Sequence, residues 1–368
     1  MSYPNSTNLD QMEAQSPSVR EKRLTSSRFQ KTTTQKTTTS SAKIVKSIRL
    51  RGALIVIIMA IALAACSQLG GPPSPFGDSS GSGTSGSNQG KLPVGTAITG
   101  WESELTSPGS MPPGMNNWSC KPTKAHPYPV ILVHGTFANE AFSWQALSPM
   151  LANAGYCVYG MNYGAEPETL GHFYGLAPMQ DSAKQLQSEV NKVLASTGAK
   201  QVDMVGWSQG GMMPRYYIKF LNGAPKVHML VGLAPSNHGT TADGLVGMAK
   251  FFTKNFGFSF NQLGCYSCTQ QEQGSSFLTN LNKGGVTPGP KYVVIESKYD
   301  EVVTPYTSAF LSGPNTQNIT LQDQCSTDYT EHLGIIYDPV ALQDVINALG
   351  SDSVNFKPHC SLVLPVFS

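Results

Sequence analysis

The sequence predicts an α/β domain with a mostly parallel central sheet and helices on both of its faces. From Pro129 onward, short runs of β-branched residues alternate with longer segments of helical periodicity, which is typical of a parallel sheet covered by helices. A Gly-x-Ser-x-Gly motif lies where one of these runs leads into a helical segment. About 270 residues follow the low-complexity N-terminal part, which is enough for one large domain.

The runs that predict strands are short and apolar. They are Val130–His134, Cys157–Tyr163, Gln201–Trp207, Lys226–Leu233 and Lys291–Ser297, with a weaker candidate at Asn318–Asp323. The segments that predict helices lie between or after these runs and repeat apolar residues at helical spacing. They are Ala141–Ala154, Met179–Ser196, Gln209–Leu221 and Pro339–Leu349.

The stretch Ser236–Pro290 does not follow this alternation, because it is rich in Gly, Phe, Met, Thr and Gln. We expect residues 236–290 to leave the sheet and to form a cap or lid. Apolar side chains of this segment would then face the site beneath it. They are Met248, Phe251, Phe252, Phe256 and Phe258.

The N-terminal part carries targeting signals. Residues 1–65 combine a basic stretch with the apolar run Ala53–Ala65, which is too short for a transmembrane helix of ~20 residues and is typical of a signal peptide. The run ends at Leu-Ala-Ala-Cys66, which resembles a bacterial lipobox and implies that Cys66 is lipidated after cleavage. An ordinary signal peptide and an uncleaved anchor are the alternatives. Residues 66–92 then form a Gly/Ser/Pro tether, and residues 93–368 form the folded domain in the cell envelope.

The folded part carries more acidic than basic residues. Residues 1–52 hold ten of the 25 Lys and Arg residues and three of the 23 Asp and Glu residues, so fifteen basic and twenty acidic residues follow. A nucleic-acid-binding domain would need a basic patch. We therefore expect no nucleic-acid partner, and we expect a monomer.

Six cysteines remain once Cys66 is set aside, and an even number is typical of an exported protein. Pairing nearest neighbours along the chain would tie both edges of the domain to its core. Of the fifteen possible pairings, this one predicts Cys120–Cys157, Cys265–Cys268 and Cys325–Cys360. Cys265 and Cys268 would alternatively form a redox pair or half a metal site, but no second CxxC and no thioredoxin-like context accompanies them.

The motif Gly206–Gly210 predicts a sharp turn from strand to helix that presents Ser208 as a nucleophile. The pattern alone is weak, because Gly77–Gly81 in the tether also matches it. That second match has no strand before it and no helix after it. Its context therefore favours Ser208, and a simple turn serine is the alternative.

A serine nucleophile needs a base to take its proton and a carboxylate to orient that base, in the chain order Ser, Asp or Glu, His. His332 is the best candidate base, because it lies in a loop before the last predicted helix. The other histidines after Ser208 lie within a strand, just after a strand end or near the C-terminus. They are His228, His238 and His359.

Asp300 is the best candidate acid. It lies just beyond the carboxyl edge of a predicted strand, where sheets of this kind place their chemistry. Glu301 is its serious competitor. The remaining acidic candidates are weaker, and they are Asp243, Asp323, Asp328 and Glu331.

A tetrahedral intermediate needs amide N–H donors directed at its oxyanion. One donor should be Gln209, the residue after the nucleophile. The other should come from the loop after the first strand, where Gly135 permits a tight turn, and we name Thr136 with Phe137 as the alternate. His134 precedes Ser208 in the chain and is expected to support this loop.

These residues resemble the class 2 lipase family of secreted bacterial α/β-hydrolases, especially the actinobacterial triacylglycerol lipases and esterases. The resembling stretches are Pro129–Thr136, Val202–Tyr217, Ser236–Thr241, Ser297–Tyr306 and Glu331–Val340. The resemblance implies an α/β-hydrolase fold. It also implies that Ser208, Asp300 and His332 form a catalytic triad and that Thr136 and Gln209 form the oxyanion hole. Trp207 departs from the His that is more frequent at its position, which should alter packing and not mechanism.

Residues and resemblance together predict an exported serine ester hydrolase, a lipase or carboxylesterase, that acts on acyl esters or lipids without a metal or an organic cofactor. A cell-envelope acyltransferase with the same triad and a non-catalytic lipid-binding surface protein are the alternatives. A lid over an apolar groove would favour lipids, and an open site would favour small soluble esters. Side chains that would line an acyl groove, or else pack in the core, are Phe137, Phe142, Trp144, Leu333, Ile335 and Ile336.

Overall fold

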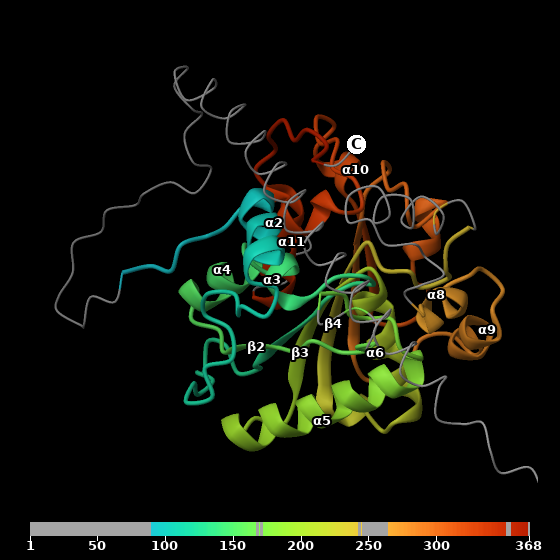
Figure 1. The fold of residues 1–368 in the computed structure, drawn as a ribbon, viewed down its shortest axis with the longest axis horizontal. Coiled ribbons are helices and arrows are strands. Elements are labelled where there is room, and N and C mark those ends of the chain that lie inside the picture. Colours follow the sequence, from blue (N-terminus) through green and yellow to red (C-terminus); the bar gives the residue numbers. More distant parts are fainter. Residues whose placement is uncertain are drawn as a thin grey trace, which may run out of the picture. The chain divides into compact units, whose positions relative to one another are not determined.

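The predicted parallel sheet forms the centre of the domain (Figure 1). A computed structural model describes residues 90–366 except 167–168, 170–171, 242–243, 245–263 and 351–354. Its six strands follow the order β2-β1-β3-β4-β5-β6, and every neighbouring pair is parallel. They are β1 (Val130–Val133), β2 (Val158–Gly160), β3 (Val202–Trp207), β4 (Val227–Leu233), β5 (Lys291–Glu296) and β6 (Thr316–Thr320). The α/β-hydrolase architecture expected from the sequence is confirmed.

Helices cover both faces of the sheet. Both faces are apolar, as β1 shows, because its successive side chains point to opposite sides and all of them are buried. Val130 and Leu132 belong to one core cluster, and Ile131 and Val133 belong to the other. The first cluster also contains side chains of α3 (Glu140–Ser143), α4 (Leu147–Asn153) and α11 (Pro339–Leu349). The second contains side chains of α5 (Met179–Thr197) and α6 (Gln209–Phe220).

The helix expected over Ala141–Ala154 is in fact two short helices, α3 and α4, with a break at residues 144–146. Pro149 explains the break. Proline has no N–H to donate and is tolerated only in the first turn of a helix, and Pro149 is the third residue of α4. A single helix would have placed this proline in its interior.

Two further elements differ from the expectation. The last strand ends at Thr320, opposite Glu296 at the end of β5, and residues expected to extend it form α10 (Leu321–Gln324). The pairing with β5 therefore sets where β6 ends. Helix α2 (Ala97–Thr106) was not predicted, and it packs through Trp101 against Phe142 with ring centroids 5.0 Å apart.

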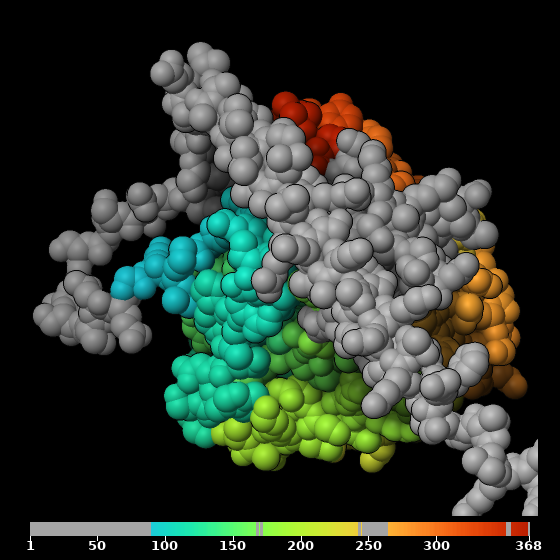
Figure 2. Space-filling view, viewed as in Figure 1, coloured from blue at the N-terminus to red at the C-terminus, as the bar shows by residue number. Residues whose placement is uncertain are grey.

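The expected excursion after β4 contributes α8 (Tyr266–Gln270) and α9 (Ser276–Asn282). These two helices form one flank of the domain, coloured orange in Figure 1 and Figure 2. Arg215 of α6 anchors this flank, since its guanidinium donates to Asn282 Oδ1 at 2.7 Å and to Asn237 Oδ1 at 3.0 Å. The lid expected over 236–290 stays a prediction, because its apolar members lie outside the described residues. They are Met248, Phe251, Phe252, Phe256 and Phe258.

The three expected disulfides are present in the structure. They join Cys120 to Cys157, Cys265 to Cys268 and Cys325 to Cys360. The signal peptide, Cys66 and the tether lie outside the described residues. In the part of the chain that the structure describes, no helix is both long enough and apolar enough to cross a membrane.

Candidate active site

Ser208 occupies a strained turn between β3 and α6. Its backbone lies at φ 55° and ψ −124°, a region that side-chain-bearing residues rarely adopt. The flanking glycines are required by close backbone approach. A Cβ at Gly206 would lie 1.9 Å from Gly210 O, and a Cβ at Gly210 would lie 2.0 Å from Val133 O. The turn therefore explains the spacing of the Gly-x-Ser-x-Gly motif.

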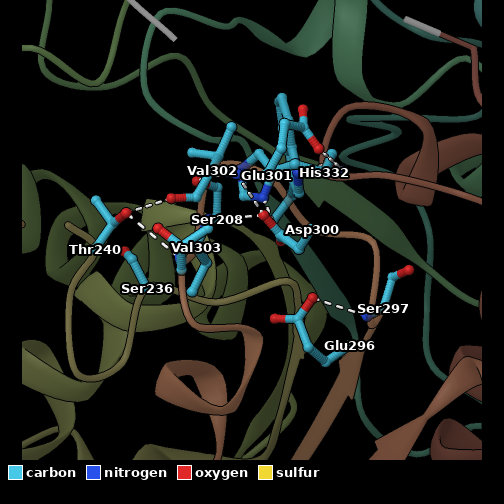
Figure 3. Close-up of polar contacts among 12 residues, drawn as sticks. Ser208, Ser236, Thr240, Glu296, Ser297, Asp300, Glu301, Val302, Val303 and His332 are labelled. Carbon is cyan, nitrogen blue, oxygen red and sulfur yellow. Dashed lines mark hydrogen bonds and ion pairs between the residues drawn. The ribbon is translucent and has the colours of Figure 1, made fainter. Parts of the chain in front are cut away.

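The structure brings Ser208, His332 and Asp300 together. His332 Nε2 lies 3.0 Å from Ser208 Oγ, and His332 Nδ1 lies 2.7 Å from Asp300 Oδ2. Figure 3 shows the three side chains pointing toward one another, although they come from the ends of different elements. All three residues are buried, with exposures of 4%, 1% and 6%. This geometry is suited to proton transfer from the hydroxyl to the imidazole.

Asp300 is held by backbone donors that leave one oxygen for the imidazole. Its Oδ1 accepts the N–H of Val302 at 2.8 Å and that of Val303 at 2.6 Å, so Oδ2 faces His332. The competing acid Glu301 makes a different contact, since its Oε2 accepts the backbone N–H of His332 at 3.3 Å. Of the two acids, Asp300 is therefore the one bonded to the ring.

The charges around His332 favour its protonated form. Burial alone would lower the pKa of His332, but the Asp300 carboxylate, its hydrogen bond, and the charges of Glu301 and Glu331 together raise this pKa above the ordinary 6.5. An imidazolium formed during proton transfer is stabilised by the same charges. The surroundings thus suit a residue that must take up a proton and later release it.

A further carboxyl lies behind Asp300. Glu296 at the end of β5 is fully buried, and its Oε1 accepts the N–H of Ser297 at 2.8 Å (Figure 3). Burial raises the pKa of Glu296 well above its ordinary value, and the neighbouring Asp300 carboxylate raises it further, while the Ser297 N–H opposes the shift. Glu296 therefore favours its uncharged form beside the charged Asp300.

Trp207 helps to hold the loop of the base. Its indole Nε1 donates to the backbone oxygen of His332 at 2.9 Å, and its ring is buried in the core. The presence of Trp at position 207 therefore affects more than packing, which was the effect predicted from the sequence. The structure adds a hydrogen bond from the residue before the nucleophile to the backbone of His332.

The other histidine candidates lie elsewhere. His228 pairs with Asp203 at 2.7 Å where β3 and β4 begin, which is the sheet edge opposite Ser208. His238 Nδ1 lies 3.1 Å from Ser308 O, and the backbone N–H of His359 donates to Gln343. The structure joins none of these three to Ser208.

The weaker acid candidates also have other contacts. Asp323 pairs with Lys298 at 2.5 Å, and Asp328 Oδ1 accepts the N–H of Thr330 at 2.9 Å. Glu331 Oε2 accepts the N–H of Val366 at 3.1 Å. Asp243 lies outside the described residues.

The two expected oxyanion donors are neighbours because β1 and β3 are neighbours, with Val133 opposite Gly206 in the register. Gln209 is the first residue of α6, where backbone N–H groups lack partners within the helix. The alternate donor Phe137 is occupied, since its N–H donates to Tyr174 O at 3.0 Å. This leaves Thr136 as the better partner for Gln209.

His134 supports the loop that carries Thr136, as expected. The ring stacks on Tyr163 with centroids 4.4 Å apart, and Tyr163 Oη donates to His134 O at 2.7 Å. Burial lowers the pKa of His134 to about 4, so the ring is neutral at neutral pH. The contact of His134 Nδ1 with Gly135 O, at 2.8 Å, opposes this shift of the pKa but is outweighed by burial.

Gln271 and Ser236 also lie at the site, although neither is among the candidates predicted from the sequence. Gln271 follows α8, and its Nε2 lies 2.9 Å from Thr136 Oγ1 and 3.1 Å from Gln209 Oε1. Ser236 Oγ donates to Gln271 Oε1 at 2.9 Å. Ser236 begins one of the stretches that resemble the family, but that resemblance assigns it no role, and a single Gln in an irregular stretch has no characteristic pattern.

The six apolar candidates for an acyl groove are buried, each with less than 8% exposure. Five of them belong to the core cluster on the α11 side of the sheet, so core packing accounts for them. They are Phe142, Trp144, Leu333, Ile335 and Ile336. Among the described residues, no group of three or more His, Cys, Asp or Glu side chains could hold a metal ion.

Two curated proteins share a limited stretch with this chain. A triacylglycerol lipase of Pseudarthrobacter phenanthrenivorans is 38% identical over 94 residues, which is 24% of this chain and 27% of that protein. A triacylglycerol lipase of Burkholderia plantarii is also 38% identical over 94 residues, 24% of each chain. The chain thus matches about a quarter of the length of these relatives.

A solved structure and a family profile extend the comparison. The crystal structure of Aspergillus fumigatus lipase B resembles the fold with a TM-score of 0.51 and 22% identity, over 65% of this chain and 55% of that one. The profile of the family described as Lipase (class 2) matches residues 127–345, which is more than half of the sequence and includes the three residues of the candidate triad. The chain belongs to the class 2 lipase family.

Proposed function

We propose that this protein is an exported serine ester hydrolase that cleaves acyl esters through an acyl-enzyme on Ser208. The observation that carries the proposal is the continuous contact from Ser208 Oγ to His332 Nε2, at 3.0 Å, and from His332 Nδ1 to Asp300 Oδ2, at 2.7 Å. A nucleophile, a base within hydrogen-bond reach and a carboxylate that orients the base are the parts this chemistry needs. Membership of a lipase family supports an ester as the substrate.

In the proposed reaction, His332 Nε2 takes the hydroxyl proton as Ser208 Oγ bonds to the ester carbonyl carbon. Asp300 stabilises the imidazolium, and the backbone N–H groups of Thr136 and Gln209 bind the oxyanion. Collapse of the intermediate expels the alcohol, which takes the proton from His332. A water molecule then attacks the acyl-enzyme with His332 as base, and the acid leaves with Ser208 restored. No metal or organic cofactor takes part.

The proposal places the enzyme in the bacterial cell envelope, held to the membrane through a lipid on Cys66. Three disulfides in one domain support an oxidising compartment, because such bonds are rare in the cytosol. The Cys66→Ser variant tests the anchor. We expect wild-type protein labelled with an alkyne fatty acid to partition with membranes and the variant to lose both label and membrane association. Equal labelling of the two proteins would remove Cys66 as the lipidation site.

Ester hydrolysis tests the activity directly. The full chain, purified in mild detergent, is assayed on p-nitrophenyl esters from acetate to palmitate. We expect Ser208→Ala to lose on the order of 10³-fold or more in kcat. Ser79→Ala, in the second Gly-x-Ser-x-Gly match, is the matched control and should keep full activity. The chain length that gives the highest kcat/KM then separates an esterase from a lipase.

Two further measurements separate the proposal from its alternatives. A p-nitrophenyl phosphonate should label Ser208 and release one equivalent of p-nitrophenol. Failure to label, together with inactivity on every ester, would favour a non-catalytic binding protein. Product analysis with an added alcohol distinguishes hydrolysis from transfer, since more transferred ester than free acid would identify an acyltransferase.

A further inference from the structure

Three uncharged side chains form a closed ring of hydrogen bonds behind the proposed oxyanion donors. Gln271 Nε2 donates to Thr136 Oγ1 at 2.9 Å and to Gln209 Oε1 at 3.1 Å. Thr136 Oγ1 in turn donates to Gln209 Oε1 at 2.8 Å. The ring joins the loop after β1, the start of α6 and the end of α8, which are far apart in the sequence.

The ring of Thr136, Gln209 and Gln271 is buried. Thr136, Gln209 and Gln271 are exposed by 3%, 0% and 3%. Away from water, an unmade hydrogen bond leaves a polar group without a partner, which destabilises the arrangement. Gln271 Nε2 thus contacts side chains of both residues whose backbone N–H groups are the proposed donors.

Gln271 is itself fixed from two sides. Ser236 Oγ donates to Gln271 Oε1 at 2.9 Å, and the Thr240 N–H donates to Gln271 O at 3.0 Å, both from the loop after β4. On the other side, the Gln271 N–H donates to Ser267 O at 3.1 Å in α8. Both the position and the direction of the amide are thereby set.

Helix α8 is in turn bound to the loop that flanks Thr136. Ser267 Oγ donates to Gly175 O at 2.6 Å, and the Ser267 N–H donates to Leu176 O at 2.9 Å. The Cys265–Cys268 disulfide closes the first turn of this helix. Through α8, the excursion after β4 thus reaches the proposed oxyanion donors, and Gln271 directly follows this helix.

We propose that Gln271 is a positioning residue that holds Thr136 and Gln209 at the separation their backbone N–H groups need to bind the oxyanion. This inference rests on the proposed ester hydrolase activity. Gln271 acts through the two donors and touches neither the acyl group nor the reacting atoms. Without it, the loop after β1 and the start of α6 lose this bridge and keep the bond from Thr136 Oγ1 to Gln209 Oε1.

The test replaces Gln271 by Met, which has similar length and no amide. We expect kcat to fall about 10-fold, which is less than the 10²–10³-fold loss expected for an oxyanion donor itself. KM should stay within about twofold, because the interaction is made in the transition state. A boronic acid that forms a tetrahedral adduct with Ser208 should bind about 10-fold more weakly, in parallel with kcat.

Gln270→Met is the matched control. Gln270 accepts the Met179 N–H at 2.7 Å and donates to Gln180 at 2.8 Å. The same substitution at this neighbouring position therefore removes two hydrogen bonds, whereas Gln271→Met removes three. These bonds lie at the start of α5, away from Thr136 and Gln209. We expect Gln270→Met to keep its kcat and boronic acid affinity while losing a similar amount of stability.

Gln271→Glu adds a readout that a purely structural role would not give. A protonated carboxyl keeps one donor, whereas the ionised form offers none and brings negative charge toward the oxyanion. The ratio of Gln271→Glu to wild-type kcat should therefore rise as the pH falls, and this ratio cancels the titration of His332. A pH-independent ratio, or equal losses in Gln270→Met and Gln271→Met, would overturn the inference. Activity remaining in Ser208→Ala would instead overturn the proposed function.

Discussion

The Asp300 and His332 side of the candidate site depends on charge, whereas the Thr136 and Gln209 side depends on neutral hydrogen bonds. The charged side joins residues only 32 positions apart, and its central contact is a carboxylate 2.7 Å from an imidazole. The neutral side recruits Gln271, which lies 135 positions from Thr136. We expect the charged side to move a proton and the neutral side to bind a developing charge without ionising.

This difference predicts how each side should respond to change. A charged pair should respond to substitution of the acid and to pH. A ring of amides and hydroxyls should respond to loss of geometry and should ignore pH over the range in which neither group titrates.

The largest effect should come from Asp300→Asn. The amide NH2 would face His332 Nδ1 and favour the wrong tautomer of the ring, so we expect kcat to fall about 10³–10⁴-fold. Asp323→Asn is the control, because Asp323 lies on the surface and pairs only with Lys298. Kinetics on one ester and thermal unfolding of both variants provide the measurement. A loss below about 10-fold would assign the orienting role to another acid.

The second prediction contrasts the disulfides on the two sides. Cys325–Cys360 closes 35 residues and holds the C-terminal segment to the loop that leads to His332, since the Tyr329 N–H donates to Val363 O at 2.9 Å. Cys265–Cys268 closes only three residues. In the chain-entropy model, removing the first by double Ser substitution should lower the free energy of unfolding by about 4 kcal/mol, and removing the second by about 1.5 kcal/mol.

The effects on activity should follow a different order at temperatures where both variants are folded. The Cys265→Ser/Cys268→Ser variant loosens α8 next to Gln271, so we expect it to lower kcat more per unit of lost stability than Cys325→Ser/Cys360→Ser does. Urea unfolding and kcat measured on the same preparations give both quantities. Equal loss of kcat per kcal/mol would show that α8 has no special link to the oxyanion side.

The sequence was sufficient to predict the charged side and most of the sheet. Ser208, Asp300 and His332 follow from one motif, one chain order and the positions of strand ends. The five clear strands follow from apolar runs, because strands buried on both faces need such runs. Nearest-neighbour pairing also predicted all three disulfides, since each ties segments that the fold places together.

The neutral side could be predicted only in part. Thr136 and Gln209 follow from their places after β1 and after the nucleophile, but Gln271 and Ser236 obtain their roles from tertiary packing. Their partners are uncharged side chains that no periodicity identifies. Trp207 is similar, because its bond to the His332 carbonyl depends on how two distant loops meet. The break between α3 and α4 has a signal in the sequence, since Pro149 cannot lie in the interior of a helix, but the prediction of one helix over Ala141–Ala154 did not use it.

The third prediction concerns pH. His332 must be neutral to accept the Ser208 proton, and its pKa lies above 6.5, so kcat/KM should fall as the pH is lowered through a midpoint above 6.5. Glu301→Gln removes one of the charges that raise this pKa, so the midpoint should move to lower pH. Gln271→Met should leave the midpoint unchanged. If the pH midpoint moved equally in Glu301→Gln and Gln271→Met, the charged and neutral sides of the site would not be distinct.

The raised pKa of His332 also predicts how the stability of the fold depends on pH. Because the pKa of folded His332 is raised, its protonated form stabilises the fold below the unfolded pKa of about 6.5, and this contribution is lost as the pH rises through the folded pKa. Glu301→Gln should reduce that contribution. Urea unfolding of both proteins at pH values on either side of the kinetic midpoint measures this contribution. A larger loss of stability in the variant above the midpoint than below it would contradict the raised pKa of His332.

The smallest effect should come from Ser236→Ala, which removes one hydrogen bond to Gln271 Oε1 and leaves the ring to Thr136 and Gln209 intact. A net value of about 1 kcal/mol for such a bond allows at most a fivefold loss of kcat, and we expect about twofold to fivefold. Ser308→Ala is the control, because Ser308 accepts from Gln273 and not from Gln271. Ser236 should act only through Gln271, so Ser236→Ala combined with Gln271→Met should lose no more kcat than Gln271→Met alone. Additive losses would mean that Ser236, whose N–H lies 3.4 Å from Ser208 O, affects the nucleophile directly, and the neutral side would then consist of two separate supports.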